Sequence, residues 1–555
     1  MKKTSLMRFR GLATTLTLAT ALLVAGCSSS GQTGSTDNGG AASSAGTTSE
    51  TPSTGGKSGG TVTMAMESDI VSLDPAFSYD FVTGLVDNQI TEGLLKFDKD
   101  SKLAPNLAEK WESPDDKTYL YYLRKDVTFQ DGTPMTIDDV LFSMERIRDP
   151  KTASYVGWMY ENVDKIEKVD DWTVKVTLSQ PDANWQYVPA TTGGYVISKK
   201  HYEANKANYG KPDGGVMGTG PFKYVSWQTG SEVILEKNPN YWDKSGGPYV
   251  DKLVYKVIPE GTTRITGLKT GQINMMIGLP LDLIDVVKKM DNVELDMVDS
   301  FLTHFAAINT QRKPFDDVKV RQAVNYALDK QKMLDQIIRD SGIPAKAVPI
   351  PPALWLFSKD KWEAAYKELP DYSYNLDKAK QLLAESSAPN GFSAKILTDG
   401  STPMLDMALA LQAAVKPLGI NLEIEKVTGE ELNTRAFGGA RDYDIVMNSW
   451  GADYPDPSGN LMPVFHSGTT GEGGSNFGNY KNPELDKLLD EQSHMTDPDK
   501  RTELMLKAQK IIADESVWVV LDHPKQILTK TKNIEGYSIT PLWYWEAFMK
   551  NVKLK

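Results

Sequence analysis

Alternating apolar segments between residues 392 and 450 constrain the fold of this chain more than any other feature. Ile420–Glu425 alternates apolar and polar side chains, which predicts a strand with one buried face. Phe392–Leu397 and Tyr443–Trp450 are two further predicted strands. Met404–Val415 and Thr428–Phe437, which lie between the strands, have the spacing of amphipathic helices. This order makes a βαβαβ unit, so the expected fold class is α/β with a parallel sheet.

The segment after the last predicted strand is the first place to expect a binding site. In parallel sheets, ligands bind beyond the carboxyl ends of the strands. Here that position holds Gly451 and Asp453, followed by Pro455 and Pro457. An aspartate before prolines also suits a turn, so the local pattern leaves a ligand contact and a turn-shaping role both open.

The N-terminal 60 residues have the pattern of an export signal. Lys2, Lys3, Arg8 and Arg10 precede an apolar run at residues 12–24, which is too short to span a bilayer. The run ends in Val-Ala-Gly-Cys, and this Cys27 is the only cysteine. The stretch resembles the lipobox of bacterial lipoproteins. We expect a signal peptide at 1–26, lipid on Cys27, a flexible tether at 27–60 and anchoring on the outer side of the cell membrane. The alternative is a plain signal peptide with an incidental cysteine.

Composition limits the function classes that remain. Residues 61–555 are too many for a single core, which predicts two or three lobes. The chain has 61 Lys and Arg against 73 Asp and Glu, and no basic patch, so nucleic acid is not an expected partner. Five scattered histidines and a single cysteine make no metal motif, and no cofactor is expected. His-Glu-x-x-His does not occur, and Gly-x-Ser-x-Gly occurs only at residues 56–60, within the Gly/Ser-rich tether and not between a predicted strand and helix. We therefore do not expect an enzyme, although a hydrolase that uses a catalytic pair of Asp or Glu residues stays as the alternative.

Six segments, in this order, resemble one family: the dipeptide/oligopeptide-binding proteins of ABC importers, solute-binding protein family 5, in the lipoprotein form of Gram-positive bacteria. The segments are Ser72–Pro75, Leu107–Trp111, Leu123–Phe129, Asp131–Pro134, Gly218–Phe222 with Asn238–Trp242, and Tyr374–Ala379.

The resemblance implies a two-lobed, periplasmic-binding-protein-like fold of type II with the ligand cleft between the lobes. The first lobe would comprise residues 61–301 and 523–555, with an inserted domain at about 96–192. The second lobe would comprise residues 303–521. Such a protein captures a short peptide as the lobes close and delivers it to an ABC permease and its ATPase subunits, without covalent chemistry.

The family pattern also implies particular binding residues. An aspartate three residues after a tryptophan holds the α-ammonium of the peptide in relatives, and Trp450 and Asp453 match that spacing. The peptide adds as a strand, for which the backbones of Ser449 and Gly451 are the second-lobe candidates. Tyr79 and Phe81 are the first-lobe candidates for lining the cleft, with a core or loop role as the alternative.

One position departs from the pattern. Some relatives carry an arginine six residues before the aspartate, where this chain has Met447. Arg435 and Arg441 are close in sequence and are the alternative partners for the ligand carboxylate, but each is interpreted as a solvated helix or turn charge. The aromatic run Trp543–Trp545 is interpreted as packing. The alternative ligands are a sugar, a metal complex, an amino-acid conjugate, or a peptide that acts as a signal.

Overall fold

The computed structural model describes residues 59–555. The predicted signal peptide, Cys27 and the tether as far as residue 58 lie outside the described residues. Within residues 59–555, no helix is both long and apolar enough to cross a membrane.

The βαβαβ prediction is confirmed in the C-terminal half. β17 pairs in parallel with β18 on one side and with β19 on the other. The helices between the strands begin and end where the periodicity indicates, and Thr428 caps the second helix by accepting from the Glu431 amide at 3.1 Å. The elements are β17 (Phe392–Thr398), α10 (Met404–Val415), β18 (Ile420–Lys426), α11 (Gly429–Phe437) and β19 (Ile445–Gly451).

Further helices surround this unit. Apolar side chains of α6, α9 and α10 form one buried cluster with the sheet. Asp317 and Asn375 cap α6 and α9 by accepting backbone hydrogen bonds. The helices are α6 (Val318–Ala327), α7 (Lys330–Ile337), α8 (Lys359–Glu368), α9 (Leu376–Ala384), α12 (Met462–Phe465), α13 (Pro483–Ser493) and α14 (Pro498–Glu515).

The N-terminal half has its own strands. One group is ordered β10-β11-β12-β1-β13, and a separate four-stranded antiparallel sheet is ordered β5-β6-β8-β7. The strands are β1 (Thr61–Met66), β10 (Phe222–Gln228), β11 (Glu232–Lys237), β12 (Lys252–Val257), β13 (Met275–Met276), β5 (Ala108–Asp115), β6 (Thr118–Leu123), β7 (Val163–Asp170) and β8 (Thr173–Leu178). The helices are α1 (Phe81–Asp87), α2 (Ile137–Arg148), α3 (Lys199–Asn205), α4 (Gly261–Thr270) and α5 (Ile284–Val287).

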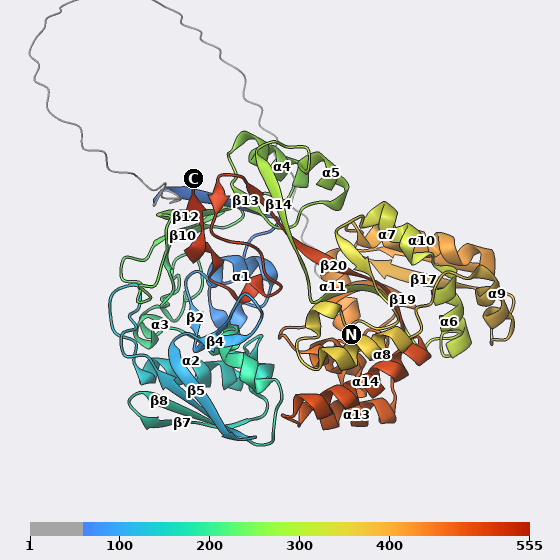
Figure 1. Cartoon of the computed structure of the whole chain (residues 1–555), viewed down its shortest axis with the longest axis horizontal. Coiled ribbons are helices and arrows are strands. Elements are labelled where there is room, and N and C mark those ends of the chain that lie inside the picture. The colour runs from blue at the N-terminus through green and yellow to red at the C-terminus, as the bar shows by residue number, and fades with distance from the viewer. Residues whose placement is uncertain (1–58) are drawn as a thin grey trace, which may run out of the picture. The chain divides into compact units, whose positions relative to one another are not determined.

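One long strand joins the two halves into a single twelve-stranded sheet. β20 (Trp518–Thr531) pairs by its first residues with β15 (Leu302–Ile308) and by its last residues with β14 (Val293–Asp299). In Figure 1 this red strand runs from the group of helices that includes α7 and α10 toward β13 and β14. The chain crosses between β14 and β15 at Ser300 and Phe301, beside the middle of β20.

A buried ion pair fixes the segment that follows β19. Asp456 accepts two hydrogen bonds from Arg501 of α14, at 2.7 and 2.9 Å, and both side chains are almost fully buried. Burial alone would raise the pKa of Asp456, but the guanidinium holds this pKa below its usual range. The pair therefore anchors the loop that carries Asp453 to the second-lobe helices.

Arg501→Met should destabilise the protein by about 3–5 kcal/mol, because it leaves the buried Asp456 carboxylate without its partner. Urea unfolding followed by circular dichroism measures the change. Lys510→Met is the matched control, since its pair with Asp514 is exposed and is worth about 0–1 kcal/mol. Equal effects of the two substitutions would contradict the anchoring role.

Candidate functional site

A cavity of about 270 Å³ lies where the two lobes meet. Its walls come from the segment before and within α1, the start of β15, the end of β19 and the C-terminal segment. The lining residues are Ser78, Tyr79, Asp80, Phe81, Gly84, Leu302, Phe437, Ser449, Trp450, Gly451, Asp453, Tyr544 and Trp545. All six binding residues expected from the sequence are among them. Their role in binding a ligand stays a prediction.

Asp453 is the ionisable group at the centre of this arrangement. Its Oδ1 accepts a hydrogen bond from the Tyr79 hydroxyl at 3.0 Å, and its backbone carbonyl accepts one from the Trp545 indole at 2.8 Å. Burial raises the pKa of Asp453 to about 6, and the hydrogen bond from Tyr79 acts in the opposite direction. No Lys, Arg or His among residues 59–555 forms an ion pair with it. The site thus holds a carboxylate whose charge lacks a protein counter-ion.

The start of α1 places two aromatic side chains in the cavity. Asp80 caps the helix by accepting from the Thr83 amide at 2.9 Å, which sets Tyr79 and Phe81 on either side of the cap. Their exposed fractions are 40% and 46%, unusually high for large aromatic residues. The Phe81 ring packs edge-on against that of Tyr544, with the ring centroids 4.9 Å apart, and both residues line the cavity.

The end of β19 forms the opposite wall. The Trp450 indole donates to the Gly459 carbonyl at 2.8 Å and packs edge-on against Phe477, so its ring is held in place. A Cβ at Gly451 would lie 2.7 Å from a methyl group of Leu302. A larger residue at Gly451 would therefore push Leu302, which lines the same cavity.

The last residues of β19 have one unpaired edge. Along its whole length β19 pairs with β15, from Ile445 opposite Ile308 to Gly451 opposite Leu302. On its other side, β17 pairs only with Ile445 and Val446. In the part of the chain that the structure describes, no strand continues this pairing beyond Val446. The Ser449 amide donates instead to the neighbouring Asn448 side chain at 2.8 Å.

Of three interpretations made from the sequence, the structure confirms one and corrects two. The aromatic run does pack, since Trp543, Tyr544 and Trp545 are buried, and Tyr544 and Trp545 also line the cavity. Arg441 is not solvated: it is 1% exposed and donates to backbone carbonyls such as that of Gly474. Arg435 is half-buried and bonds to acidic side chains. Sequence reasoning missed Phe437 and Leu302, whose places in the cavity depend on the contact between lobes.

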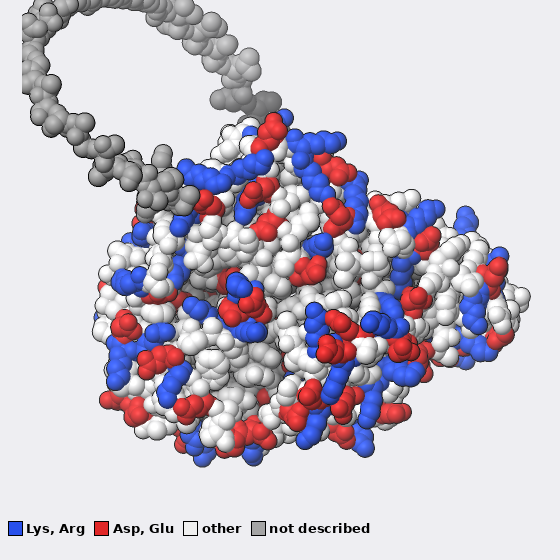
Figure 2. Space-filling view, viewed as in Figure 1, with Lys and Arg blue, Asp and Glu red and all other residues white. Residues whose placement is uncertain are grey.

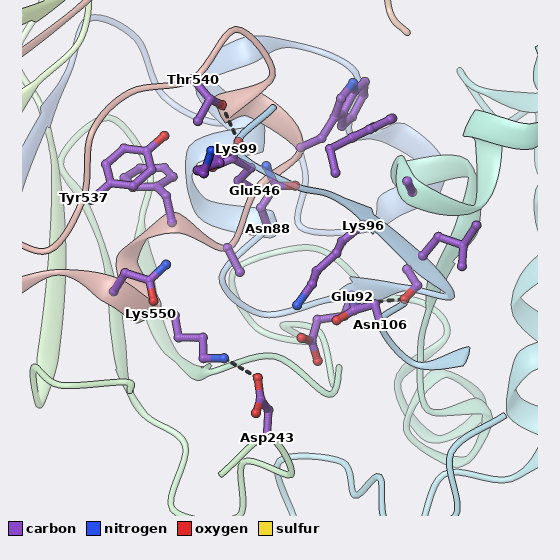
Figure 3. Close-up of a pocket in the computed structure, with 18 of the residues that line it drawn as sticks. Asn88, Glu92, Lys96, Lys99, Asn106, Asp243, Tyr537, Thr540, Glu546 and Lys550 are labelled. Atoms are coloured by element: carbon purple, nitrogen blue, oxygen red, sulfur yellow. Dashed lines mark hydrogen bonds and ion pairs between the residues drawn. The ribbon is translucent and has the colours of Figure 1, made fainter. Parts of the chain in front are cut away.

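A second cavity, of about 490 Å³, lies between the first lobe and the C-terminal segment (Figure 3). Two of its acidic groups have partners within the lining: Lys550 pairs with Asp243, and Thr540 donates to Glu546, as the dashed lines in Figure 3 show. Burial raises the pKa of Glu546 to about 7. No second-lobe residue lines this cavity, so closure of the lobes would not enclose a ligand there.

Charge elsewhere on the surface is mixed. On the face that Figure 2 shows, Lys and Arg side chains alternate with Asp and Glu side chains. Among residues 59–555, no group of three or more His, Cys, Asp or Glu is placed to hold a metal ion.

Fold and cavity together define a two-lobed binding protein with its ligand site between the lobes. The family of bacterial extracellular solute-binding proteins, family 5, matches residues 102–472. This chain belongs to that family.

Individual relatives are similar over nearly the whole chain. Heme-binding protein A of Haemophilus influenzae is 31% identical over 489 residues, covering 83% of this chain and 86% of that protein. The ABC transporter-associated periplasmic binding protein DppA of Helicobacter pylori, solved with the peptide STSA, has a TM-score of 0.77 and 29% identity, covering 90% of this chain and 98% of that one. The oligopeptide-binding protein AppA of Bacillus subtilis, solved with a nonapeptide, has a TM-score of 0.75 and 26% identity, covering 90% and 100%.

The raised pKa of Asp453 predicts a pH-dependent stability of the ligand-free protein. The folded state binds this proton more tightly than the unfolded chain does. The free energy of unfolding of the wild type should therefore fall by roughly 1–3 kcal/mol relative to that of Asp453→Asn as the pH rises from about 4 to about 6. Above this range the difference should stay constant. Urea unfolding of both proteins across this pH range measures the difference.

Tyr79→Phe is the companion variant for this measurement. It removes the hydrogen bond that favours the ionised carboxylate, so the pH window should move upward. A difference between wild type and Asp453→Asn that does not vary with pH would contradict the assigned shift.

Proposed function

We propose that this protein captures short peptides outside the cell and delivers them to an ABC permease. The observation that carries the proposal is the Asp453 carboxylate, which faces the interlobe cavity and is satisfied only by the Tyr79 hydroxyl. An ionised carboxylate that is taken out of water requires a cation. A peptide α-ammonium supplies both the charge and three hydrogen-bond donors.

The unpaired edge of β19 supports a peptide over other amines. The residues beyond Val446 whose second edge lacks a strand partner include Ser449 and Gly451, which line the cavity. A peptide that lies along this edge gains main-chain hydrogen bonds that do not depend on its sequence. The carbonyl of the peptide would replace the Asn448 side chain as acceptor for the Ser449 amide.

We propose that the lobes open and close about the two chain crossings, Ser300–Phe301 and Asp522–Pro524. There β20 changes partner from β15 to β14, so a small change in backbone angles would move one lobe against the other. In the present structure the lobes touch, because Tyr454 of the second lobe stacks on Tyr187 of the first, with ring centroids 5.8 Å apart. The ligand would therefore be enclosed, and the permease would recognise the closed form.

The first test is mass spectrometry of the small molecules released by denaturation from purified residues 59–555. We expect a mixture of short peptides. If the released material is instead one non-peptide compound, such as a sugar or a metal complex, the protein is still a solute-binding protein but the assignment of a peptide ligand is wrong.

Asp453→Asn should weaken the binding of a peptide by about 2–4 kcal/mol, since the ammonium loses its buried counter-charge while the fold is retained. Isothermal titration of protein freed of ligand measures this change. Asp442→Asn is the control, because Asp442 is exposed and bonds Arg435 on the surface. If Asp453→Asn binds the peptide as tightly as the wild type does, Asp453 does not bind the ligand.

We propose that Cys27 carries lipid and holds the protein at the membrane. Cys27→Ser should move the protein from the membrane fraction to the medium and abolish incorporation of labelled palmitate. Peptide affinity should not change. Retention of the variant on the membrane would show that another element anchors the chain.

A further inference from the structure

The charges that line the interlobe site have one sign. A smaller cavity, of about 120 Å³, adjoins the interlobe cavity of about 270 Å³ and shares Phe81 and Leu302 with it. The charged residues lining the two cavities are Glu67, Asp80 and Asp453, and none of the lining residues, all of which lie in the described part of the chain, is Lys, Arg or His. The charged groups that line the site therefore favour a cation over an anion there.

The arginines near the site in sequence are engaged elsewhere. Arg441 is buried and donates to backbone carbonyls that include Asn476 at 3.0 Å, Thr470 at 2.6 Å and Gly474 at 2.7 Å. Arg435 bonds Glu425 at 2.6 Å and Asp442 at 2.8 Å. Releasing Arg441 to meet a ligand would leave buried carbonyls without donors, and releasing Arg435 would break its ion pairs with Glu425 and Asp442.

The three carboxylates of the site differ in what they can offer a ligand. Asp80 is engaged in capping α1. The Glu67 side chain is 58% exposed, and its one charged neighbour is Arg264 at 3.9 Å, whose guanidinium hydrogen bonds go to carbonyls such as that of Gly278 at 2.9 Å. Glu67 and Asp453 are thus the two carboxylates that can meet positive charge, while aromatic faces such as those of Phe81 and Trp450 add a weaker attraction for cations.

We propose that this site selects peptides by positive charge and does not bind their carboxylate. On this inference, which rests on the proposed function, the α-ammonium meets Asp453 and a basic side chain near the N-terminus extends toward Glu67. The C-terminal carboxylate lies outside both cavities, because inside them it would be desolvated beside carboxylates of like charge.

Matched alanine tetrapeptides test this directly by isothermal titration. Amidating the C-terminus of Ala-Lys-Ala-Ala should change its Kd by less than about fivefold, while acetylating its N-terminus should weaken binding by more than about tenfold. Ala-Lys-Ala-Ala should bind more than about fivefold tighter than Ala-Glu-Ala-Ala, and Glu67→Gln should shrink that ratio.

The outcomes separate the two proposals. If amidation weakens binding by fivefold or more, or if the lysine and glutamate peptides bind alike, the charge selection is overturned and peptide capture stands. If acetylation has no effect, or if none of the peptides binds, the proposed function fails and this inference fails with it. A lysine preference that Glu67→Gln leaves intact would overturn the assignment to Glu67.

Discussion

The continuous strand β20 is the interaction on which the rest of the structure depends. Its fourteen residues hydrogen-bond to β15 at one end and to β14 at the other, and nearly all of them are buried. A strand shared by two lobes keeps the lobes in one register while leaving the short crossings beside it free to bend. The cavity lies where the start of β15 and the end of β19, which pair with each other, meet α1 and the C-terminal segment of the first lobe.

The chemistry of the site follows from that geometry. Contact between the lobes takes water away from Asp453 and raises its pKa to about 6, while the buried Asp456–Arg501 pair holds the same loop from behind. Two aspartates three residues apart thus have opposite electrostatic roles. Asp456 is neutralised by a guanidinium and stabilises the loop, whereas Asp453 keeps a charge that the protein does not balance. A binding protein can use such an unbalanced charge, because a bound cationic ligand balances it.

Much of the fold could be predicted from local patterns, because these patterns report interactions between near neighbours in sequence. The period of apolar residues predicted α10 and β18, and Thr428 marked the start of α11. The charge of Arg441 was misread, and the places of Tyr544 and Trp545 in the cavity wall were missed, for the opposite reason. Tyr544 reaches the Ala452 carbonyl, and Arg441 reaches carbonyls around Gly474, through contacts that no local period encodes.

The sequence alone determined the α/β class, the βαβαβ unit, the family resemblance and the candidate Asp453, because strand and helix periods and short motifs are properties of contiguous residues. Only the tertiary structure decided that Tyr79 donates to Asp453, 374 residues away, that the edge of β19 is unpaired beyond Val446, and that the cavity is walled by carboxylates and aromatic rings. Those features arise where two lobes meet. The charge and burial of each side chain there depend on the neighbours that folding supplies.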